Sequence, residues 1–341
     1  MYRLCVFLYA LFAATQAQAL ACGDIVTGYV RLDASLHCSS DWYALMVGGD
    51  NTTIDLNGHT LSGTRDQLGI DVLGYQHVSI VGNGRLSGFW AGIRGHEAHF
   101  LKVENTWFDN LGTGITLSHT SNAEIRQNRF SDSGSRALSI RTTPYHSTPS
   151  SNNIISDNEF TRSDVGIHLC GITTRDNQVL DNRLSQMGWT AIQLEDETHS
   201  NQLHRNDVTG SYAGLAMFNS NDNEVSGERY TDNEIGVWLA AQPPGPCRNT
   251  ASVKVRGNVL KSMSLFNNQI AARFGGTSTG AVVENKLYGS KVYDNQYGFY
   301  LDSESVNNTT VDSALYGTVT PITDLGSGNI TTPNYCSPGA C

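Results

Sequence analysis

Proline is scarce in this sequence, with 8 residues among 341, and charged residues make up only 16%. Basic residues are outnumbered by acidic ones, 22 against 32, which argues against a nucleic-acid partner because phosphate binding requires clustered Lys and Arg. No apolar run is long enough to cross about 30 Å of hydrocarbon, so we expect no membrane span. Glycine, in contrast, is abundant at 34 residues, and Asn, Ser and Thr occur throughout. This composition predicts many short strands and tight turns, with little room for helices.

The first residues have the pattern of a secretory signal. Arg3 precedes an apolar run from Leu4 to Ala14, and the stretch 17–19 supplies the small-x-small pattern that a signal peptidase needs. Cleavage near residues 19–21 would place Cys22 at or near the mature N-terminus. A lipid anchor on Cys22 is an alternative, although Ala19 is smaller than the usual aliphatic residue at that position. We therefore predict a signal peptide over 1–21 and a secreted or periplasmic protein.

The cysteine count becomes even once the signal is removed. Loss of the signal takes away Arg3 and Cys5, which leaves 21 basic residues, 32 acidic residues and six cysteines, a net charge of −11. Six cysteines in an exported chain are typical of disulfides, but leave fifteen connectivities open. The favoured pairs, Cys22–Cys38 and Cys336–Cys341, each close a short terminal loop. Cys170 and Cys247 then remain and would pair with each other, if they pair at all.

An internal repeat organises most of the chain. Three sets of apolar positions recur, the second five residues after the first and the third seven to nine residues later. The first set is Leu56, Val81, Val103, Ile125, Ile155, Val179, Leu203, Val225, Leu260 and Leu287. The second is Leu61, Leu86, Phe108, Phe130, Phe160, Leu184, Val208, Tyr230, Leu265 and Val292. The third is Ile70, Ile93, Ile115, Leu138, Ile167, Ile192, Leu215, Val237, Ala272 and Phe299.

A shortest period of about 22 residues allows three short strands in each coil. One coil cannot bury its apolar face alone, whereas stacked coils about 4.8 Å apart form a continuous core. The sequence therefore predicts an all-β, right-handed parallel β-helix of about ten to eleven coils. We expect an N-terminal cap over 22–50, the β-helix over 51–310 and a C-terminal cap or tail over 311–341.

Asparagine recurs three residues after the first apolar position in four consecutive coils. Stacked coils would place these side-chain amides above one another as a hydrogen-bonded ladder with a structural role. The four residues are Asn128, Asn158, Asn182 and Asn206.

The repeat resembles the right-handed parallel β-helix repeat family. This group includes pectate-lyase-like enzymes, polysaccharide lyases, mannuronan C5-epimerases and a periplasmic copper-maturation protein. The resemblance covers about residues 50–310, together with an N-terminal opening from Cys22 to Cys38 and the segment Thr53–Leu61. It implies the fold but not one activity, because the fold carries several chemistries. The Asp-Pro-His-Asp signature of the mannuronan epimerases and the Asn-Thr-Asp, Asp-Asp and Arg-Ile-Lys set of the polygalacturonases are absent, so no family's catalytic residues can be transferred.

Strand alternation predicts one outward-facing parallel sheet after the third apolar position. Two enlarged turns, 142–152 and 241–258, leave from its edge and could wall a groove for a linear polysaccharide. We expect the substrate-binding side chains to come from this sheet and its loops: Arg94, His146, Gln193, Phe218, Trp238, Arg273 and Tyr300.

The catalytic candidates are Arg141, His168 and Glu195, around the middle of this sheet, and Tyr145, on the first enlarged turn. In β-elimination or C5-epimerisation of a uronic acid, a cation neutralises the carboxylate, a base removes the C5 proton and an acid protonates the product. We assign Arg141 as the neutralising cation, His168 as the base and Tyr145 as the acid, with Gln193 and Glu195 orienting them. A surface histidine and an Arg141–Glu195 ion pair are the structural alternatives.

Other functions remain open at this point. A non-catalytic glycan-binding or adhesin-like protein would explain the same fold, charge and aromatic residues, and a glycoside hydrolase would need a carboxylate pair that only Glu195 begins to supply. No cofactor is expected, although Glu195, Asp196 and Glu197 could hold Ca²⁺. Copper handling is the least favoured function, because the five Met and ten His residues do not cluster in metal-ligand spacing along the sequence.

Overall fold

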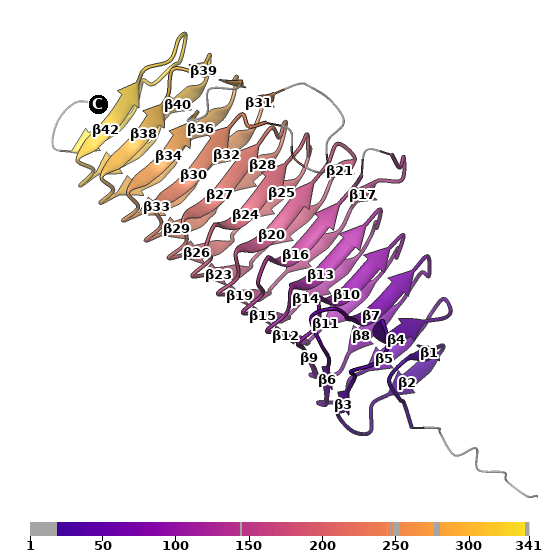
Figure 1. Cartoon of the computed structure of the whole chain (residues 1–341). Coiled ribbons are helices and arrows are strands. Elements are labelled where there is room, and N and C mark those ends of the chain that lie inside the picture. The colour runs from indigo at the N-terminus through magenta and orange to yellow at the C-terminus, as the bar shows by residue number, and fades with distance from the viewer. Residues whose placement is uncertain are drawn as a thin grey trace, which may run out of the picture.

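A computed structural model describes residues 19–143, 145–243, 245, 247, 253–275, 280–337 and 341. The chain winds into one elongated parallel β-helix, with the coils stacked in sequence order from the N-terminal to the C-terminal end (Figure 1). Three long parallel sheets run along the solenoid, two of thirteen strands and one of twelve. The predicted fold class, a right-handed parallel β-helix, is confirmed.

Each coil contributes one strand to each long sheet. Sheet A contains β1 (Asp24–Val26), β4 (Tyr43–Val47), β7 (Leu68–Leu73), β10 (Ala91–His96), β13 (Thr113–Ser118), β16 (Arg136–Arg141), β20 (Val165–Cys170), β24 (Thr190–Glu195), β27 (Ala213–Phe218), β30 (Ile235–Ala240), β34 (Ile270–Phe274), β38 (Tyr297–Leu301) and β42 (Thr320–Asp324). Sheet B contains β2 (Tyr29–Arg31), β5 (Thr53–Asp55), β8 (Ser79–Val81), β11 (Lys102–Glu104), β14 (Glu124–Arg126), β18 (Ile154–Ser156), β22 (Gln178–Leu180), β25 (Gln202–His204), β28 (Glu224–Ser226), β32 (Val259–Lys261), β36 (Lys286–Tyr288) and β40 (Thr309–Val311).

Sheet C completes each coil, and two small sheets lie beside the long ones. Sheet C contains β3 (Leu36–His37), β6 (Thr60–Ser62), β9 (Arg85–Ser87), β12 (Trp107–Asp109), β15 (Arg129–Ser131), β19 (Glu159–Thr161), β23 (Arg183–Ser185), β26 (Asp207–Thr209), β29 (Arg229–Thr231), β33 (Ser264–Phe266), β37 (Lys291–Tyr293), β41 (Ala314–Tyr316) and β43 (Tyr335–Ser337). The small sheets pair β17 (Ser150–Ser151) with β21 (Thr174–Arg175), and β31 (Lys254–Arg256) with β35 (Ala281–Val283) and β39 (Ser305–Val306).

The core is built from the three predicted rows of apolar side chains. In sheet A the third set is in register from Ile70 to Phe299, and in sheet C the second set is in register from Leu61 to Val292. The rings of Phe108, Phe130 and Phe160 stack with centroids 4.6 Å apart, which matches the spacing between strands. Coil-to-coil packing of like side chains is therefore what encloses the core.

The register of the first two coils in sheet B differs from the prediction. Val103 pairs with Ile80, and Ile80 pairs with Ile54, so Leu56 and Val81 are not the row members in these coils. Both Ile54 and Ile80 are fully buried. The turn between β8 and β9 is longer than the turn between β11 and β12. The fixed five-residue spacing used for the prediction therefore selects the wrong residue in the first coils.

The solenoid has about thirteen coils rather than ten or eleven. The segments 22–50 and 311–341, which the sequence separated as caps, contain β1–β4 and β41–β43, and these strands pair with their neighbours in the long sheets. Their apolar positions are sparser, so the repeat is hard to recognise in sequence there. Among the described residues no helix is long and apolar enough to cross a membrane.

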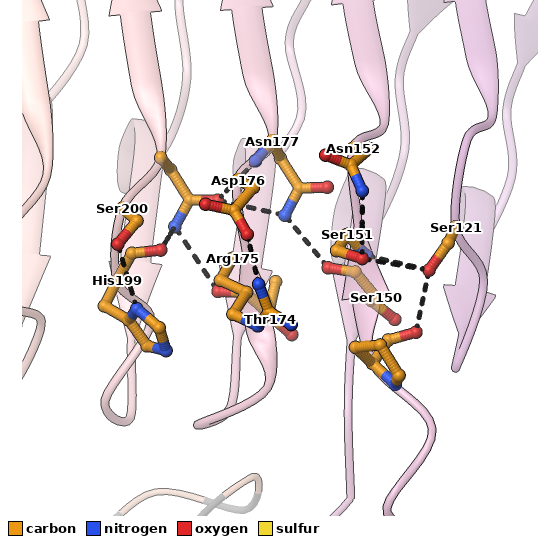
Figure 2. Close-up of polar contacts among 12 residues, drawn as sticks. Ser121, Ser150, Ser151, Asn152, Thr174, Arg175, Asp176, Asn177, His199 and Ser200 are labelled. Carbon is orange, nitrogen blue, oxygen red and sulfur yellow. Dashed lines mark hydrogen bonds and ion pairs between the residues drawn. The ribbon is translucent and has the colours of Figure 1, made fainter.

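Asparagine ladders stabilise the turns between the sheets. The predicted ladder is present: the Nδ2 of Asn128, Asn158 and Asn182 each donate to the Oδ1 of the next asparagine at 2.9–3.1 Å. A second ladder at another turn was not predicted and runs through Asn153, Asn177, Asn201, Asn223, Asn258, Asn285, Asn308 and Asn329. Figure 2 shows a part of this region, where Asn177 Nδ2 donates to the carbonyl oxygen of Ser150 at 3.0 Å.

All three predicted disulfides are present. Each joins its pair at a Cα–Cα distance of 5.4–5.8 Å, which suits a disulfide bond: Cys22–Cys38, Cys170–Cys247 and Cys336–Cys341. The Cys170–Cys247 bond fixes part of the second enlarged turn to the end of β20 on the outer face of sheet A.

Candidate functional site

A cavity of about 370 Å³ lies on the outer face of sheet A, over β13 and β16. Its lining includes three arginines, Arg65, Arg136 and Arg141, and the indole of Trp90. Thr116 and Ser139 provide hydroxyl groups at its floor. No carboxylate belongs to the described lining, so the cavity is cationic within a chain of net charge −10.

The three arginines differ from the other arginines of the outer face because they have no acidic partner. Arg94 is held by Asp71 through two hydrogen bonds, 2.8 Å and 2.6 Å, and Arg273 is held by Asp302 at 3.0 Å. In the described part of the chain, none of Arg65, Arg136 and Arg141 forms a salt bridge; Arg65 donates to Asn110 Oδ1 at 2.9 Å, and Arg141 to Ser118 Oγ at 3.4 Å. None of these charges is held in an ion pair, although that of Arg136 also acts on Glu195, so the arginines can meet an anionic ligand.

Behind the cavity a chain of hydrogen bonds joins three neighbouring coils. Ser139 Oγ lies 3.3 Å from His168 Nδ1, and His168 Nε2 lies 3.0 Å from Glu195 Oε2. Gln193 Nε2 donates to the same carboxylate oxygen at 3.0 Å, and Thr190 Oγ1 donates to Gln193 Oε1 at 3.0 Å. A neutral His168 that donates from Nε2 to Glu195 presents its Nδ1 lone pair to the Ser139 hydroxyl, which opens on the cavity.

Burial and charge set the protonation of this chain. Burial lowers the pKa of His168 below its ordinary 6.5, and nearby Arg136 and Arg141 lower it further, while the hydrogen bond to Glu195 opposes them. Burial by itself would raise the pKa of Glu195, but hydrogen bonds from His168 and Gln193 and the charge of Arg136 bring it below the ordinary 4.5. At neutral pH the pair is therefore a carboxylate and a neutral imidazole.

The outward rows of sheet A have the predicted register but not the predicted exposure. Ser139, His168 and Gln193 are adjacent across β16, β20 and β24. His168 is only 2% exposed, however, and the rest of the middle of the row is also buried. Side chains of neighbouring coils cover one another here. A second apolar cluster, separate from the core of the solenoid, lies on β27 and β30 and includes Phe218 and Trp238.

The remaining predicted site residues do not meet in one place. Tyr145 is 92% exposed, so its ring packs against almost nothing, and Tyr300 lies farther along the solenoid beside Arg273. Phe218 and Trp238 are buried against each other, and Trp238 Nε1 donates to the carbonyl oxygen of Gly275 at 2.9 Å. His146 lies away from them, with its ring 4.6 Å from that of His119 and 6.0 Å from that of His96 between centroids.

Arg65 and Arg136 of the cavity lining, and three aromatic residues of the site region, were not among the site residues predicted from sequence. Trp90, Trp189 and Tyr212 each stand three residues before the third apolar position, and the rings of Trp189 and Tyr212 stack at 4.7 Å. That recurrent position could have been recognised. Arg136 stands two residues before Leu138, whose side chain points into the core, so strict alternation predicts that Arg136 also points inward. Arg136 is the first residue of β16, however, and its guanidinium lines the cavity.

The second enlarged turn closes over Glu195. Asp196 accepts hydrogen bonds from the backbone N–H groups of Gly245 (3.0 Å) and Cys247 (3.1 Å). A β-carbon at Gly245 would lie 2.6 Å from Asp196 Oδ2 and 2.7 Å from Glu195 Oε1, so only glycine allows this approach. Residues 244, 246 and 248–252 of the turn lie outside the described residues.

Fold and cavity together define a β-helix protein with a cationic site on its outer sheet. The sequence matches the family described as periplasmic copper-binding protein (NosD) over residues 47–188, 146–262 and 181–335. Because these matches cover most of the chain, the protein belongs to the NosD family. No curated protein sequence matches it significantly.

Solved structures share the fold at low sequence identity. A periplasmic alginate epimerase is 12% identical with a TM-score of 0.60, over 92% of this chain and 73% of its own. An α-1,3-glucanase from Streptomyces thermodiastaticus is 13% identical with a TM-score of 0.63, over 94% of this chain and 62% of its own. The tailspike protein of E. coli bacteriophage HK620, solved with a pentasaccharide, is 10% identical with a TM-score of 0.62, over 84% of this chain and 59% of its own. At these identities the similarity establishes the fold.

The copper in the family's description can be tested against the donor atoms present. Among the described residues two groups bring three potential ligand atoms within 4.8 Å of one another: His168, Cys170 and Glu195, and Cys170, Asp196 and Cys247. Both groups require Cys170, whose sulfur is bonded to Cys247. A thiolate is the form that binds metal, so neither group fits copper while the disulfide is intact.

Proposed function

We propose that this protein is exported and binds a uronate-containing polysaccharide along the outer face of sheet A, where it acts as a lyase or C5-epimerase. The observation that carries the proposal is the cavity lined by Arg65, Arg136 and Arg141, three arginines without acidic partners. Guanidinium groups bind carboxylates in bidentate geometry, and the repeating units of a linear glycan can lie across successive coils.

The arrangement of side chains supports proton transfer at C5. Arg141 and Arg136 neutralise the substrate carboxylate, which stabilises the negative charge that develops when the C5 proton leaves. His168 is the proposed base, and because it is buried it acts through Ser139: the hydroxyl takes the C5 proton as its own proton passes to His168 Nδ1. Glu195 stabilises the resulting imidazolium. Tyr145 lies on the first enlarged turn outside the cavity lining, and it is the proposed acid for the leaving oxygen or for the opposite face if its exposed side chain reaches over a bound glycan.

Binding without turnover is the second candidate function, and the burial of the base favours it. His168 and Ser139 are 2% and 5% exposed, an arrangement that would also suit a rigid floor under a bound glycan. The cavity lining offers no pair of carboxylates, so a hydrolase mechanism has less support from this geometry.

The test is incubation of the mature protein with polyuronates and neutral glycans, followed by ultraviolet absorbance of unsaturated ends and by deuterium uptake at C5 from heavy water. We expect one signal with a polyuronate. Arg141→Gln should reduce it roughly 10- to 100-fold, the effect of losing one charge-assisted contact of about 1.5–3 kcal/mol.

Arg162→Gln is the matched control, because Arg162 is an exposed arginine paired with Asp132 outside the cavity. It should leave the signal unchanged. Full activity in both Arg141→Gln and His168→Ala would contradict the proposal, whereas binding of a polyuronate without any product would establish the non-catalytic alternative.

A further inference from the structure

Two aromatic rings lie between two carboxylates along one edge of sheet A. Each of the four residues stands directly before a sheet A strand, on four successive coils: Asp164, Trp189, Tyr212 and Glu234. Backbone hydrogen bonds hold them in this order, because the N–H of Trp189 donates to the carbonyl oxygen of Asp164 at 2.9 Å, and the N–H after Glu234 donates to that of Tyr212 at 2.8 Å. The Trp189–Tyr212 pair is therefore flanked by one acid on each side.

The two rings are held in one orientation. They stack with centroids 4.7 Å apart and an interplanar angle of 9°. Both meet the ring of Trp238 edge to face, at 6.0 Å for Trp189 and 6.4 Å for Tyr212. Trp238 itself is buried and anchored by its hydrogen bond to the carbonyl oxygen of Gly275. A platform that is already rigid loses little conformational entropy when a ligand binds to it.

One face of the Trp189 indole remains open. Tyr212 covers the face directed toward the C-terminal end of the solenoid, so the opposite face is directed toward the coil of Asp164, whose side chain is too short to cover an indole. Trp189 is 37% exposed, because the outer apolar cluster uses only the edge of its ring. The negative face of an aromatic ring attracts the C–H groups of a sugar ring and removes its apolar side from water.

The flanking carboxylates determine which sugar fits this face. Asp164 and Glu234 are exposed, and across the described part of the chain neither side chain forms a hydrogen bond or an ion pair. A β-carbon on Gly188 would lie 3.0 Å from Asp164 Oδ1, so this carboxylate lies beside the backbone that carries Trp189. Carboxylates accept hydrogen bonds from sugar hydroxyl groups, whereas they repel the carboxylate of a uronate.

The arginine cavity lies close by in the same row. Ser135, which lines the cavity, stands directly before β16, and Trp189 stands directly before β24. These strands are two spacings apart in sheet A, about 10 Å. One glycan can therefore contact both places, and along it the charge of the protein changes from positive to negative.

We propose that the Trp189–Tyr212 pair and its flanking carboxylates form a subsite for a sugar unit that has no carboxylate, next to the cavity that takes the uronate. The substrate is then a heteropolysaccharide of uronate and uncharged sugars rather than a chain of uronate alone. The uronate part of this inference rests on the proposed function. The aromatic subsite does not, and it binds an uncharged glycan by itself.

The experiment is calorimetric titration of the mature protein with three sets of oligosaccharides. Fragments of alginate and polygalacturonate contain only uronate, fragments of cellulose and mannan contain only uncharged sugars, and fragments of gellan and xanthan contain both. We expect at least one mixed fragment to bind about tenfold more tightly than the uronate fragments, the effect of one aromatic contact. Trp189→Ala should remove this advantage and leave the affinity for the uronate fragments unchanged.

Asp164→Asn tests the role of charge with a variant that is expected to fold, since Asp164 is exposed and its carboxylate has no partner among the described residues. Removal of the repulsion should strengthen binding of the uronate fragments roughly two- to fivefold, the scale of one surface charge. Unchanged binding of these fragments would contradict the exclusion of uronate from the subsite.

Trp107→Ala is the matched control, because Trp107 is an exposed tryptophan on sheet C. It should leave every affinity as in the wild type. If uronate fragments bind but Trp189→Ala keeps wild-type affinity for all three sets, the subsite is overturned and the proposed function stands. Binding of uncharged fragments alone, lost in Trp189→Ala, would support the subsite and contradict the uronate cavity. No binding of any set would overturn both.

Discussion

At the scale of single residues, Glu228 is the most unusual group in the solenoid. It occupies the position at which four preceding coils carry a ladder asparagine, and its Oε1 accepts hydrogen bonds from the N–H (3.2 Å) and Nδ2 (2.9 Å) of Asn206. Tyr230 donates to its Oε2 at 2.9 Å. Burial nevertheless dominates and raises the pKa of Glu228 from 4.5 to about 8, so the side chain is protonated in the folded protein at neutral pH.

This raised pKa predicts a pH-dependent stability. The contribution of Glu228 is fully present below pH 4.5 and is lost as the pH rises through about 8, because only the unfolded chain ionises freely in that window. Glu228→Gln should therefore match the wild type near pH 4.5 and exceed it at pH 9 by roughly 3–5 kcal/mol at most. Urea unfolding at the two pH values would measure the difference.

Glu234→Gln serves as the comparison, because Glu234 is exposed one turn later in the chain. It should leave the pH dependence of unfolding as in the wild type. Equal stability of Glu228→Gln and wild type at pH 9 would show that the buried carboxyl is not neutral in the folded state.

At the scale of elements, the ladder asparagines join the coils at the turns, where strand pairing ends. Asn182 makes four such contacts: its Nδ2 donates to the Ile155 carbonyl and to Asn206 Oδ1, and its Oδ1 accepts from the N–H and Nδ2 of Asn158. All of these groups are buried, so water cannot replace the amide. The ladder thus supplies partners for backbone groups that neither sheet pairs.

Removal of one member should destabilise the whole solenoid. Asn182→Ala leaves buried donors and acceptors unsatisfied, and we expect a loss of at least about 2 kcal/mol in the free energy of unfolding. Gln202→Ala, at an exposed amide in β25, should cost far less. Denaturant titration of the two variants checks the prediction, and similar losses in both would contradict a role for the ladder.

At the scale of the whole molecule, two long-range features shape the candidate site. The Cys170–Cys247 bond spans 77 residues of sequence and ties the second enlarged turn beside Glu195, and Asp196 reinforces this attachment. Positive charge is concentrated in the Arg65, Arg136 and Arg141 cavity although the chain as a whole is acidic. A polyanion would therefore be attracted to one place rather than to the surface in general.

The disulfides should contribute unequally to stability. A crosslink restricts the unfolded chain more when it closes a longer loop, so Cys170→Ala/Cys247→Ala should cost about 2–5 kcal/mol. Cys336→Ala/Cys341→Ala, whose loop spans 5 residues at the C-terminus, should cost less. Thermal unfolding of both double variants without reductant makes the comparison, and a larger loss for the terminal pair would refute this order.

The repeat explains why the fold could be predicted. Coils of a solenoid contact only their neighbours, so a row such as Phe108, Phe130 and Phe160 recurs in sequence at the period at which it stacks in space. The asparagine ladder follows from the same regularity, whereas the three disulfides were predicted from short terminal loops and from the two cysteines that remained. Where the turn length changes, as after Ile54 and Ile80, the prediction failed by one or two residues.

The sequence by itself determined the architecture of this protein, because stacking at a fixed period is a local property that each coil repeats. The tertiary structure alone decided the site. Alternation predicts which way His168 points but not that its neighbours bury it. No local sequence pattern shows that Arg94 pairs with Asp71 whereas Arg136 forms no ion pair. The meeting of His96, His119 and His146 likewise depends on where an irregular turn returns to the sheet, which no periodicity encodes.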